Sequence, residues 1–329
     1  MRFLRTVFGV SESHRMFQPD VLRWKCFAPH PFWEGSRGYA LRYKGEIAAF
    51  GCLVPCRFLT GSETVASCNV IDWAASKTVP GAGILLYRHI QSLTGTMLNI
   101  GGTADARQVL PRIGFQASAE IHHYTRVLRP WRHLRIAGQK DWKSPLRLAR
   151  DYRQLGRTLG GTLPSLAARR VNSFADVPAE AFPDPSITRQ VVCARTSASL
   201  KYFMACPAAQ MDAYILERDH TPAGYFLLSR VGRHQYRIAD LWIRSADGQE
   251  WAAAYGTASA TAQTDPRITQ VSIAATLPLQ TGALEQAGYR RNHTEPVFVL
   301  DPGRALGGRH DLALSSLEND GYYWTESGS

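Results

Sequence analysis

The sequence predicts an α/β (α+β) protein made of two tandem domains, each a mixed, mostly antiparallel central sheet flanked by helices. Runs of β-forming residues alternate with apolar patterns of helical period along the chain. The order of these elements repeats once, and the repeat lengths agree: Ile47 lies 67 residues before Gly114, and Pro222 lies 66 before Gly288. The 329 residues, 45% of them hydrophobic, can fill two cores.

The first predicted domain covers residues 1–130. A helix is expected over 17–25, and turn signals at Lys44-Gly45 and Thr60-Gly61 separate three extended runs that follow it. These runs cover 39–43, 47–59 and 64–75. The remaining predicted elements are a helix over 81–93, a strand over 97–100, a helix over 104–112 and a strand pair over 115–128.

The second predicted domain covers residues 171–329 and repeats this order. Its elements are strands over 211–217, 223–231 and 235–243, a helix over 250–264, a strand over 268–274, a helix over 279–287 and an extended run over 296–300. Residues 131–170 are predicted to form a basic linker with an amphipathic helix that starts near Ser144-Pro145. One face of this helix is expected to carry Leu148, Tyr152, Leu155 and Leu159.

Charge and cysteine content narrow the class of protein. The net charge is +11, and twelve Lys or Arg against two Asp lie between Arg126 and Arg170, so the basic character is local. This argues against a general polyanion-binding protein. No apolar run is long enough for a membrane span, and a cytoplasmic protein is expected. The six cysteines lack zinc-site spacing and are expected to be buried, reduced thiols, and no metal is expected.

Three segments of the first domain carry a family resemblance. They are Asn69-Val-Ile-Asp-Trp-Ala-Ala-Ser76, then Pro80-Gly-Ala-Gly-Ile-Leu-Leu86, then Leu110-Pro-Arg-Ile-Gly-Phe115. With the strand–turn–strand over 39–50, they resemble the GNAT (N-acetyltransferase) superfamily over roughly residues 35–128, including its fourth strand and pyrophosphate loop. Gly81 and Gly83 permit close backbone approach, and the following helix offers free amides and a positive dipole end to an anion.

The resemblance implies that acetyl-CoA or another acyl-CoA is the substrate. Backbone amides of the fourth strand would polarise the thioester carbonyl, and the loop would hold the pyrophosphate. The expected CoA-binding residues are Trp73, Ala74, Ala75, Thr78, Val79, Pro80, Gly81, Ala82, Gly83 and Thr103. The family's catalytic tyrosine falls on Leu110 and its loop Arg or Gln on Thr78, so the usual proton donor is missing. Asp72, the carboxylate of the fourth strand, is therefore the expected general base.

The second copy departs further from the family pattern. Its loop reads Ser245-Ala-Asp-Gly-Gln-Glu250, which keeps one glycine and adds two carboxylates that would repel a pyrophosphate. We therefore predict a degenerate domain that binds the acceptor or is structural. Asp240 on its corresponding strand is a second candidate catalytic residue, placed toward the cleft between the domains.

The predicted reaction is direct acyl transfer in a ternary complex with an amine or hydroxyl of a small-molecule, glycan or amino-sugar acceptor. Two alternatives stay open: a Fem-like aminoacyl ligase that uses aminoacyl-tRNA, and a non-catalytic CoA-binding or scaffold protein. The basic segment over 131–159 suits an anionic membrane surface, with the protein peripheral at that membrane, or tRNA in the ligase alternative. It also suits a solvated linker helix whose arginines pair with acidic faces.

Overall fold

The computed structural model describes residues 1–61, 63–138, 141–159, 165–175, 177–184, 190–307 and 311–323. The first part of the chain alternates helices and strands as the sequence predicts. Its elements are α1 (Arg2–Phe8), α2 (Pro19–Phe27), β1 (Gly38–Tyr43), β2 (Glu46–Thr60), β3 (Glu63–Ala75), α3 (Ala82–Gln91), β4 (Thr96–Ile100), α4 (Ala104–Val109) and β5 (Gln116–Val127). The predicted strand pair over 115–128 is wrong, because β5 is one unbroken strand.

Two helices and a second run of strands and helices complete the chain. They are α5 (Pro130–Ile136), α6 (Ser144–Leu159), β6 (Ala167–Val171), β7 (Val191–Cys193), α7 (Ser197–Met204), β8 (Gln210–Arg218), β9 (Thr221–Gly232), β10 (Gln235–Ile243), α8 (Gly248–Gln263), β11 (Gln270–Ala275), α9 (Pro278–Gln286), β12 (Arg290–Leu300) and β13 (Leu312–Ala313). Short 3-10 turns include η4 (Ser316–Glu318). The strands and helices predicted over 211–300 are all present within a few residues.

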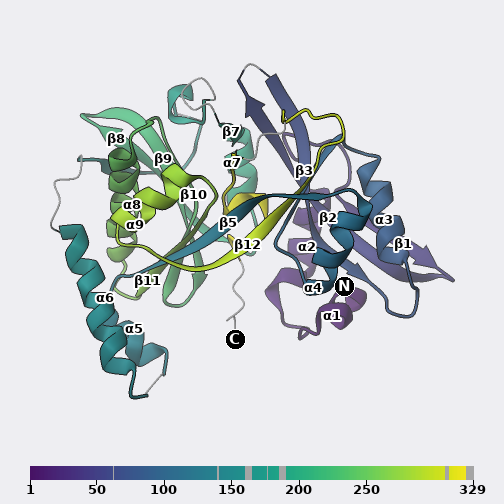
Figure 1. Cartoon of the computed structure of the whole chain (residues 1–329), viewed down its shortest axis with the longest axis horizontal. Coiled ribbons are helices and arrows are strands. Elements are labelled where there is room, and N and C mark those ends of the chain that lie inside the picture. Colours follow the sequence, from purple (N-terminus) through teal and green to yellow (C-terminus); the bar gives the residue numbers. More distant parts are fainter. Residues whose placement is uncertain are drawn as a thin grey trace.

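The described strands form a single continuous sheet. Its order is β13-β7-β2-β3-β4-β12-β5-β11-β10-β9-β8-β6, with β1 paired to β2. Strand β12, from the end of the chain, lies between β4 and β5, and β5 pairs with β11. Figure 1 shows these two long strands crossing the middle of the molecule. Strands from the two halves therefore alternate at the centre of the sheet and hydrogen-bond to one another.

The two halves repeat one unit. In the first half β3, α3 and β4 form a strand–helix–strand crossover with parallel pairing between Ser67–Asn69 and Thr96–Leu98. In the second half β10, α8 and β11 do the same, with parallel pairing between residues 235–238 and 270–273. Figure 1 places α3 on one side of the molecule and α8 on the other. The element order that the sequence repeats is thus present in space.

Apolar packing fixes both units. In the first half α3 lies on the sheet through Leu86, Tyr87 and Ile90, which join a core that also includes Phe298 of β12. In the second half α8 and α9 bury a larger core around Trp251 and Tyr255. All six cysteines are buried and free, which confirms the expectation of reduced thiols.

The last described segment, residues 311–323, lies between the halves. The Asn69 Nδ2 atom of β3 donates a hydrogen bond of 2.7 Å to the Glu318 carbonyl oxygen. Leu317, Tyr322 and Tyr323 of this segment join the core of the second half. Residues far apart in the sequence therefore meet at this boundary, where the ionic clusters described below are found.

The predicted amphipathic helix is present as α6, but one of its inward residues is wrongly placed. Leu148 and Leu155 are half-buried and Asp151 is buried, whereas Tyr152 is 52% exposed. Tyr152 lies on the outer face because the inner face follows residues 144, 148, 151 and 155, at helical spacing. Residues 160–164 of the predicted linker lie outside the described residues.

Candidate functional site

The strongest candidate site begins where β3 ends. The turn over residues 76–81 leaves Lys77, Thr78, Pro80 and Gly81 exposed and leads directly into α3. Gly81 is the residue before the helix and has φ 81° with open space around it. The first turn of α3 contains no acidic residue, so no carboxylate on it opposes an anion at the positive end of the helix dipole. The exposed turn and the helix start behind it are therefore compatible with an anion.

The two loop glycines have different roles. A Cβ atom on Gly83 would lie 3.0 Å from the Ala75 Cβ and 3.4 Å from the Trp73 Nε1, so Gly83 lets α3 pack closely against β3. The Trp73 Nε1 donates to the Gly83 carbonyl at 3.1 Å. Gly83 is buried, which corrects the expectation that its backbone approaches a ligand. Gly81 alone has the exposed, left-handed conformation that this approach requires.

Next to this turn, β3 contains a β-bulge. Phe50 pairs with Ala74 and Cys52 pairs with Ile71, so Gly51 alone faces both Asp72 and Trp73. Asp72 has φ 53°, a left-handed conformation that is uncommon for a residue other than glycine. A bulge leaves one residue outside the hydrogen-bonded ladder and bends the strand. Strain of this kind is typical of functional positions.

Beside the bulge, β3 and β4 separate. Their parallel ladder ends at Asn69 and Leu98, although β3 continues to Ala75. The Asn99 Nδ2 spans the gap and donates to the Val70 carbonyl at 3.4 Å. The Asn99 side chain and the Tyr87 hydroxyl are buried beside each other there; burial raises the pKa of Tyr87, and its contact with Asn99 opposes that shift. The open edge of β3 therefore lies beside buried polar side chains.

Asp72, the predicted general base, is held in a buried ion pair. The Lys25 Nζ of α2 lies 2.8 Å from the Asp72 Oδ2, and both side chains are almost fully buried. The Asp320 Oδ2 lies 3.9 Å from the same nitrogen. Burial opposes the charge on Lys25, but the two carboxylates outweigh this effect and raise its pKa. Lys25 therefore stays protonated, and Asp72 keeps one oxygen, Oδ1, without a partner among the described residues.

Asp320 supplies the second carboxyl group near the Lys25 Nζ. Burial raises the pKa of Asp320 to about 6, while Lys25 opposes the shift. Its side chain is one-fifth exposed. A carboxyl group with such a pKa can exchange a proton at neutral pH. Sequence reasoning did not find Asp320 or Lys25, since neither lies in a motif.

The raised pKa of Asp320 makes stability depend on pH. The folded protein binds this proton more tightly than the unfolded chain, whose carboxyl group has a pKa of 3.8, so this contribution to the free energy of unfolding falls as pH rises from about 4 to about 6. We expect Asp320→Asn to remove that fall. Relative to wild type, the variant should gain about 2–3 kcal/mol between pH 4 and pH 7.

Urea unfolding at a series of pH values measures this difference. The control is Asp105→Asn, at an exposed position in the first turn of α4. Parallel pH curves for wild type and Asp320→Asn would show that Asp320 titrates like an ordinary surface carboxyl group.

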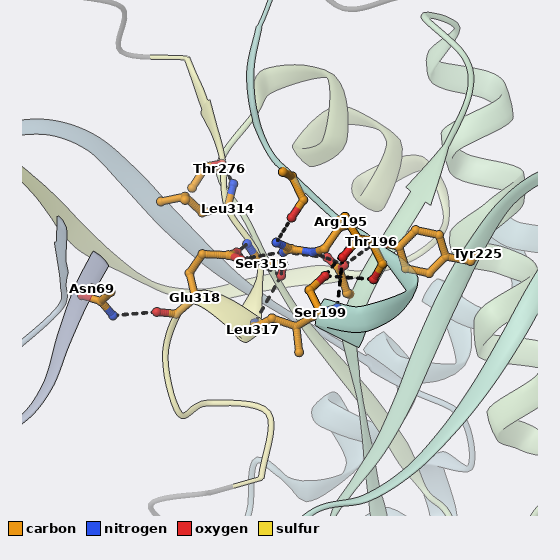
Figure 2. Close-up of polar contacts among 12 residues, drawn as sticks. Asn69, Arg195, Thr196, Ser199, Tyr225, Thr276, Leu314, Ser315, Leu317 and Glu318 are labelled. Atoms are coloured by element: carbon orange, nitrogen blue, oxygen red, sulfur yellow. Dashed lines mark hydrogen bonds and ion pairs between the residues drawn. The ribbon is translucent and has the colours of Figure 1, made fainter. Parts of the chain in front are cut away.

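Asp240, the second predicted catalytic residue, belongs to a separate buried network around Arg195. The Arg195 Nε lies 2.7 Å from the Asp240 Oδ2, and the Arg195 Nη2 lies 2.6 Å from the Glu318 Oε1. The Tyr225 hydroxyl donates to the Asp240 Oδ2 at 2.6 Å. Burial opposes the charge on Arg195, but Asp240 and Glu318 outweigh it and raise its pKa. Figure 2 shows Glu318 between Arg195 and Asn69, so this network connects the two halves.

Asp240 also lines a small cavity beside β10 and β11. Trp242 and Gln280 line the same cavity, and both are more than nine-tenths buried. The Trp242 Nε1 and the Gln280 Oε1 have no hydrogen-bond partner in the described ranges. The cavity therefore presents one unpaired donor and one unpaired acceptor next to a carboxylate.

The corresponding helix start in the second half is blocked. Asp247 precedes α8, and its side chain accepts a hydrogen bond of 2.9 Å from the Gln249 amide. Glu250 adds a second carboxylate to the first turn. Two negative charges at a helix N-terminus oppose a phosphate. That the second copy does not bind CoA stays a prediction.

The remaining predicted position, Thr103, caps α4. Its hydroxyl accepts a hydrogen bond of 3.2 Å from the Ala106 amide. Thr103 is separated from Ile100, the last residue of β4, by Gly101 and Gly102, whose positive φ angles of 71° and 87° turn the chain. Leu110 and Leu284, at the family's tyrosine positions, are fully buried in the two cores. Structure thus brings the bulge, the turn and the end of β4 together, while Asp240 lies in its own cluster.

A third cluster lies on β5 and β12. Ligand-type atoms of His123, His293 and Glu295 lie within 4.8 Å of one another. The His123 Nε2 is 3.1 Å from the Glu295 Oε2, and this contact lowers the pKa of Glu295. Glu295 also lies against Gly101, because a Cβ atom there would be 3.0 Å from its Oε1. The expectation that the function needs no metal stays a prediction.

No protein-family model matches this sequence, and no curated protein matches it. Solved structures do match. A GCN5-related N-acetyltransferase from Anabaena variabilis aligns with 94% of this chain and 71% of its own, with a TM-score of 0.59 and 12% identity. The chain has the GNAT fold.

Other matches have the same fold. The N-myristoyltransferase of Saccharomyces cerevisiae, solved with bound myristoyl-CoA, has a TM-score of 0.58 at 11% identity and covers 87% of this chain and 74% of its own. A GCN5-related N-acetyltransferase from Kribbella flavida has a TM-score of 0.52 at 13% identity, over 83% and 63%. The GNAT resemblance in residues 35–128 therefore identified the fold correctly.

Proposed function

We propose that this protein is an acyltransferase that moves an acyl group directly from acetyl-CoA or another acyl-CoA to an amine or hydroxyl of a small-molecule or amino-sugar acceptor. One observation carries this proposal. A single strand, β3, combines a bulge at Asp72–Trp73 and an open edge toward β4 with the exposed turn at Gly81. The match to a yeast N-myristoyltransferase solved with bound myristoyl-CoA supports the same substrate class.

In this proposal the diphosphate of CoA binds at the Gly81 amide and the start of α3, with exposed Lys77 adding positive charge. The acyl-CoA then follows the gap between β3 and β4, where Asn99 and Tyr87 offer buried polar atoms. Backbone amides on the open edge of β3 donate to the thioester oxygen as negative charge develops on it. Residues 1–130 thus hold the acyl donor.

The acceptor nitrogen or oxygen attacks the thioester carbonyl carbon, and the carbon–sulfur bond breaks to release the CoA thiolate. The acceptor loses one proton, and the thiolate gains one. Asp320 is the group we assign to the first transfer, because burial raises its pKa to about 6. Asp72 holds Lys25 beside it and acts as a positioning residue.

The C-terminal half is proposed to bind the acceptor. The cavity next to Asp240 has a volume of only about 30 Å³, so it can take one small polar group of an acceptor, which the Trp242 Nε1 and the Gln280 Oε1 could bond. The two carboxylates at the start of α8 oppose a diphosphate at that position. We also propose that the protein is cytoplasmic, because its proposed substrate is an acyl-CoA.

Calorimetric titration with acetyl-CoA, longer acyl-CoAs and free CoA tests the proposal. We expect saturable, one-site binding of at least one acyl-CoA, followed by release of the CoA thiol when a panel of amines and amino sugars is added. Absence of acyl-CoA binding would overturn the proposal. Acyl-CoA binding without transfer to any acceptor would favour the non-catalytic alternative instead.

A further inference from the structure

The basic segment after β5 forms a helical hairpin at one edge of the molecule. Helices α5 and α6 contact each other, and Figure 1 shows both at the periphery, away from the strands that cross the centre. The Arg129 side chain anchors its start by donating to the Asp265 and Gln263 carbonyl oxygens, beside α8. The hairpin is therefore held at its base and presents its outer face to solvent.

That outer face carries large apolar side chains. Trp142 is 77% exposed, Leu146 is 63% exposed and Trp131 is 57% exposed. On α6, residues 145, 146, 149, 152 and 156 are all exposed and lie on one side, opposite buried Asp151. Exposed aromatic and aliphatic side chains gathered on one helical hairpin mark an interaction surface.

The same hairpin carries excess positive charge. Residues 131–138 and 141–156 contain six Lys or Arg and two Asp. Both carboxylates form ion pairs within the hairpin: Asp141 lies 3.0 Å from Arg147, and Asp151 lies 2.7 Å from Arg150. Arg135 and Arg153 are exposed and have no carboxylate partner among the described residues. The unpaired charge thus lies beside the exposed apolar side chains.

We propose that the α5–α6 hairpin docks the protein on an anionic lipid surface. Tryptophan and tyrosine favour the boundary between lipid headgroups and acyl chains, and arginine can reach the phosphates while its stem lies along apolar surface. No helix in the described ranges is long and apolar enough to cross a membrane. Exposed Trp142 and Leu146 favour lipid over nucleic acid, which would need charge and stacking but no aliphatic insertion. The surface is separate from the β3 turn, so the inference goes beyond the proposed acyl transfer.

Sedimentation with vesicles tests this proposal. The vesicles contain phosphatidylcholine alone or phosphatidylcholine with phosphatidylglycerol. We expect binding to the anionic vesicles only, weakened by added salt. The pair Arg135→Gln and Arg153→Gln should lower vesicle affinity roughly tenfold or more, and the pair Trp142→Ser and Leu146→Ser should lower it by a similar factor.

Matched controls change exposed residues elsewhere. Phe27→Ser alters a side chain that is 66% exposed on α2, and Arg88→Gln alters an exposed residue on α3. Neither should change vesicle binding, and the hairpin variants should leave any acyl-CoA affinity in solution unchanged. Wild-type protein that fails to sediment with anionic vesicles overturns the proposal. So does wild-type protein that binds RNA and not vesicles, or hairpin variants that sediment like wild type.

Discussion

Gly81→Glu is expected to abolish acyl-CoA binding. The new carboxylate would stand in the exposed turn before α3, where we place the diphosphate. Two like charges about 4 Å apart near a protein surface repel by about 4 kcal/mol, so affinity should fall at least ~100-fold. Calorimetric titration with the best-binding acyl-CoA measures the loss.

Gly45→Glu is the matched control. Gly45 lies in the exposed turn between β1 and β2, has φ 86° and, like Gly81, has no atom near the position of a new Cβ. Both variants therefore carry the same left-handed strain of about 1–2 kcal/mol and the same added charge. Equal acyl-CoA affinity in the two variants would show that the Gly81 turn does not hold the diphosphate.

Arg195→Met is expected to give the largest loss of stability. The substitution removes the cation that pairs with Asp240 and Glu318, whose side chains are less than one-tenth exposed. Removing one partner of a buried ion pair costs about 3–5 kcal/mol, because the remaining charge is left uncompensated. Because Glu318 lies next to Asn69, the loss should also weaken contact between the halves.

Urea unfolding compares this variant with Arg169→Met. Arg169 also lies 2.7 Å from a carboxylate, that of Glu217, but its side chain is 55% exposed. An exposed pair contributes about 0–1 kcal/mol. If Arg195→Met does not fold, Arg195→Lys, which keeps the charge but loses the forked geometry, should show an intermediate loss. Equal stability of Arg195→Met and Arg169→Met would contradict the role of this network.

Local features of the site could be read directly from the sequence. The turn at Pro80–Gly83 follows a β-forming run and precedes an apolar helical pattern, so its place between β3 and α3 was predictable. The two carboxylates at Asp247 and Glu250 likewise predicted a blocked helix start in the second half. Each of these inferences depends on residues within one turn or one crossover.

Other parts of the site depend on strand register. The bulge at Asp72 arises because two residues of β3 face Gly51 of β2, and no local pattern states that pairing. Strand pairing also explains why the prediction for β5 was wrong. It was predicted as two strands, but it runs unbroken because it pairs with β11 on one side and β12 on the other. Tyr152 was placed inward because an apolar side chain at helical spacing usually packs, whereas here the hairpin leaves it exposed.

The sequence by itself determined the kinds of element, their order, their repetition and the glycine turn that starts α3. Only the tertiary structure decided which distant side chains meet: Lys25 with Asp72, 47 residues apart, and Arg195 with Glu318, 123 apart. The physical reason is the distance along the chain over which the deciding interactions act. Backbone conformation follows from neighbouring residues, whereas a buried charge is stable only beside a partner that folding brings to it.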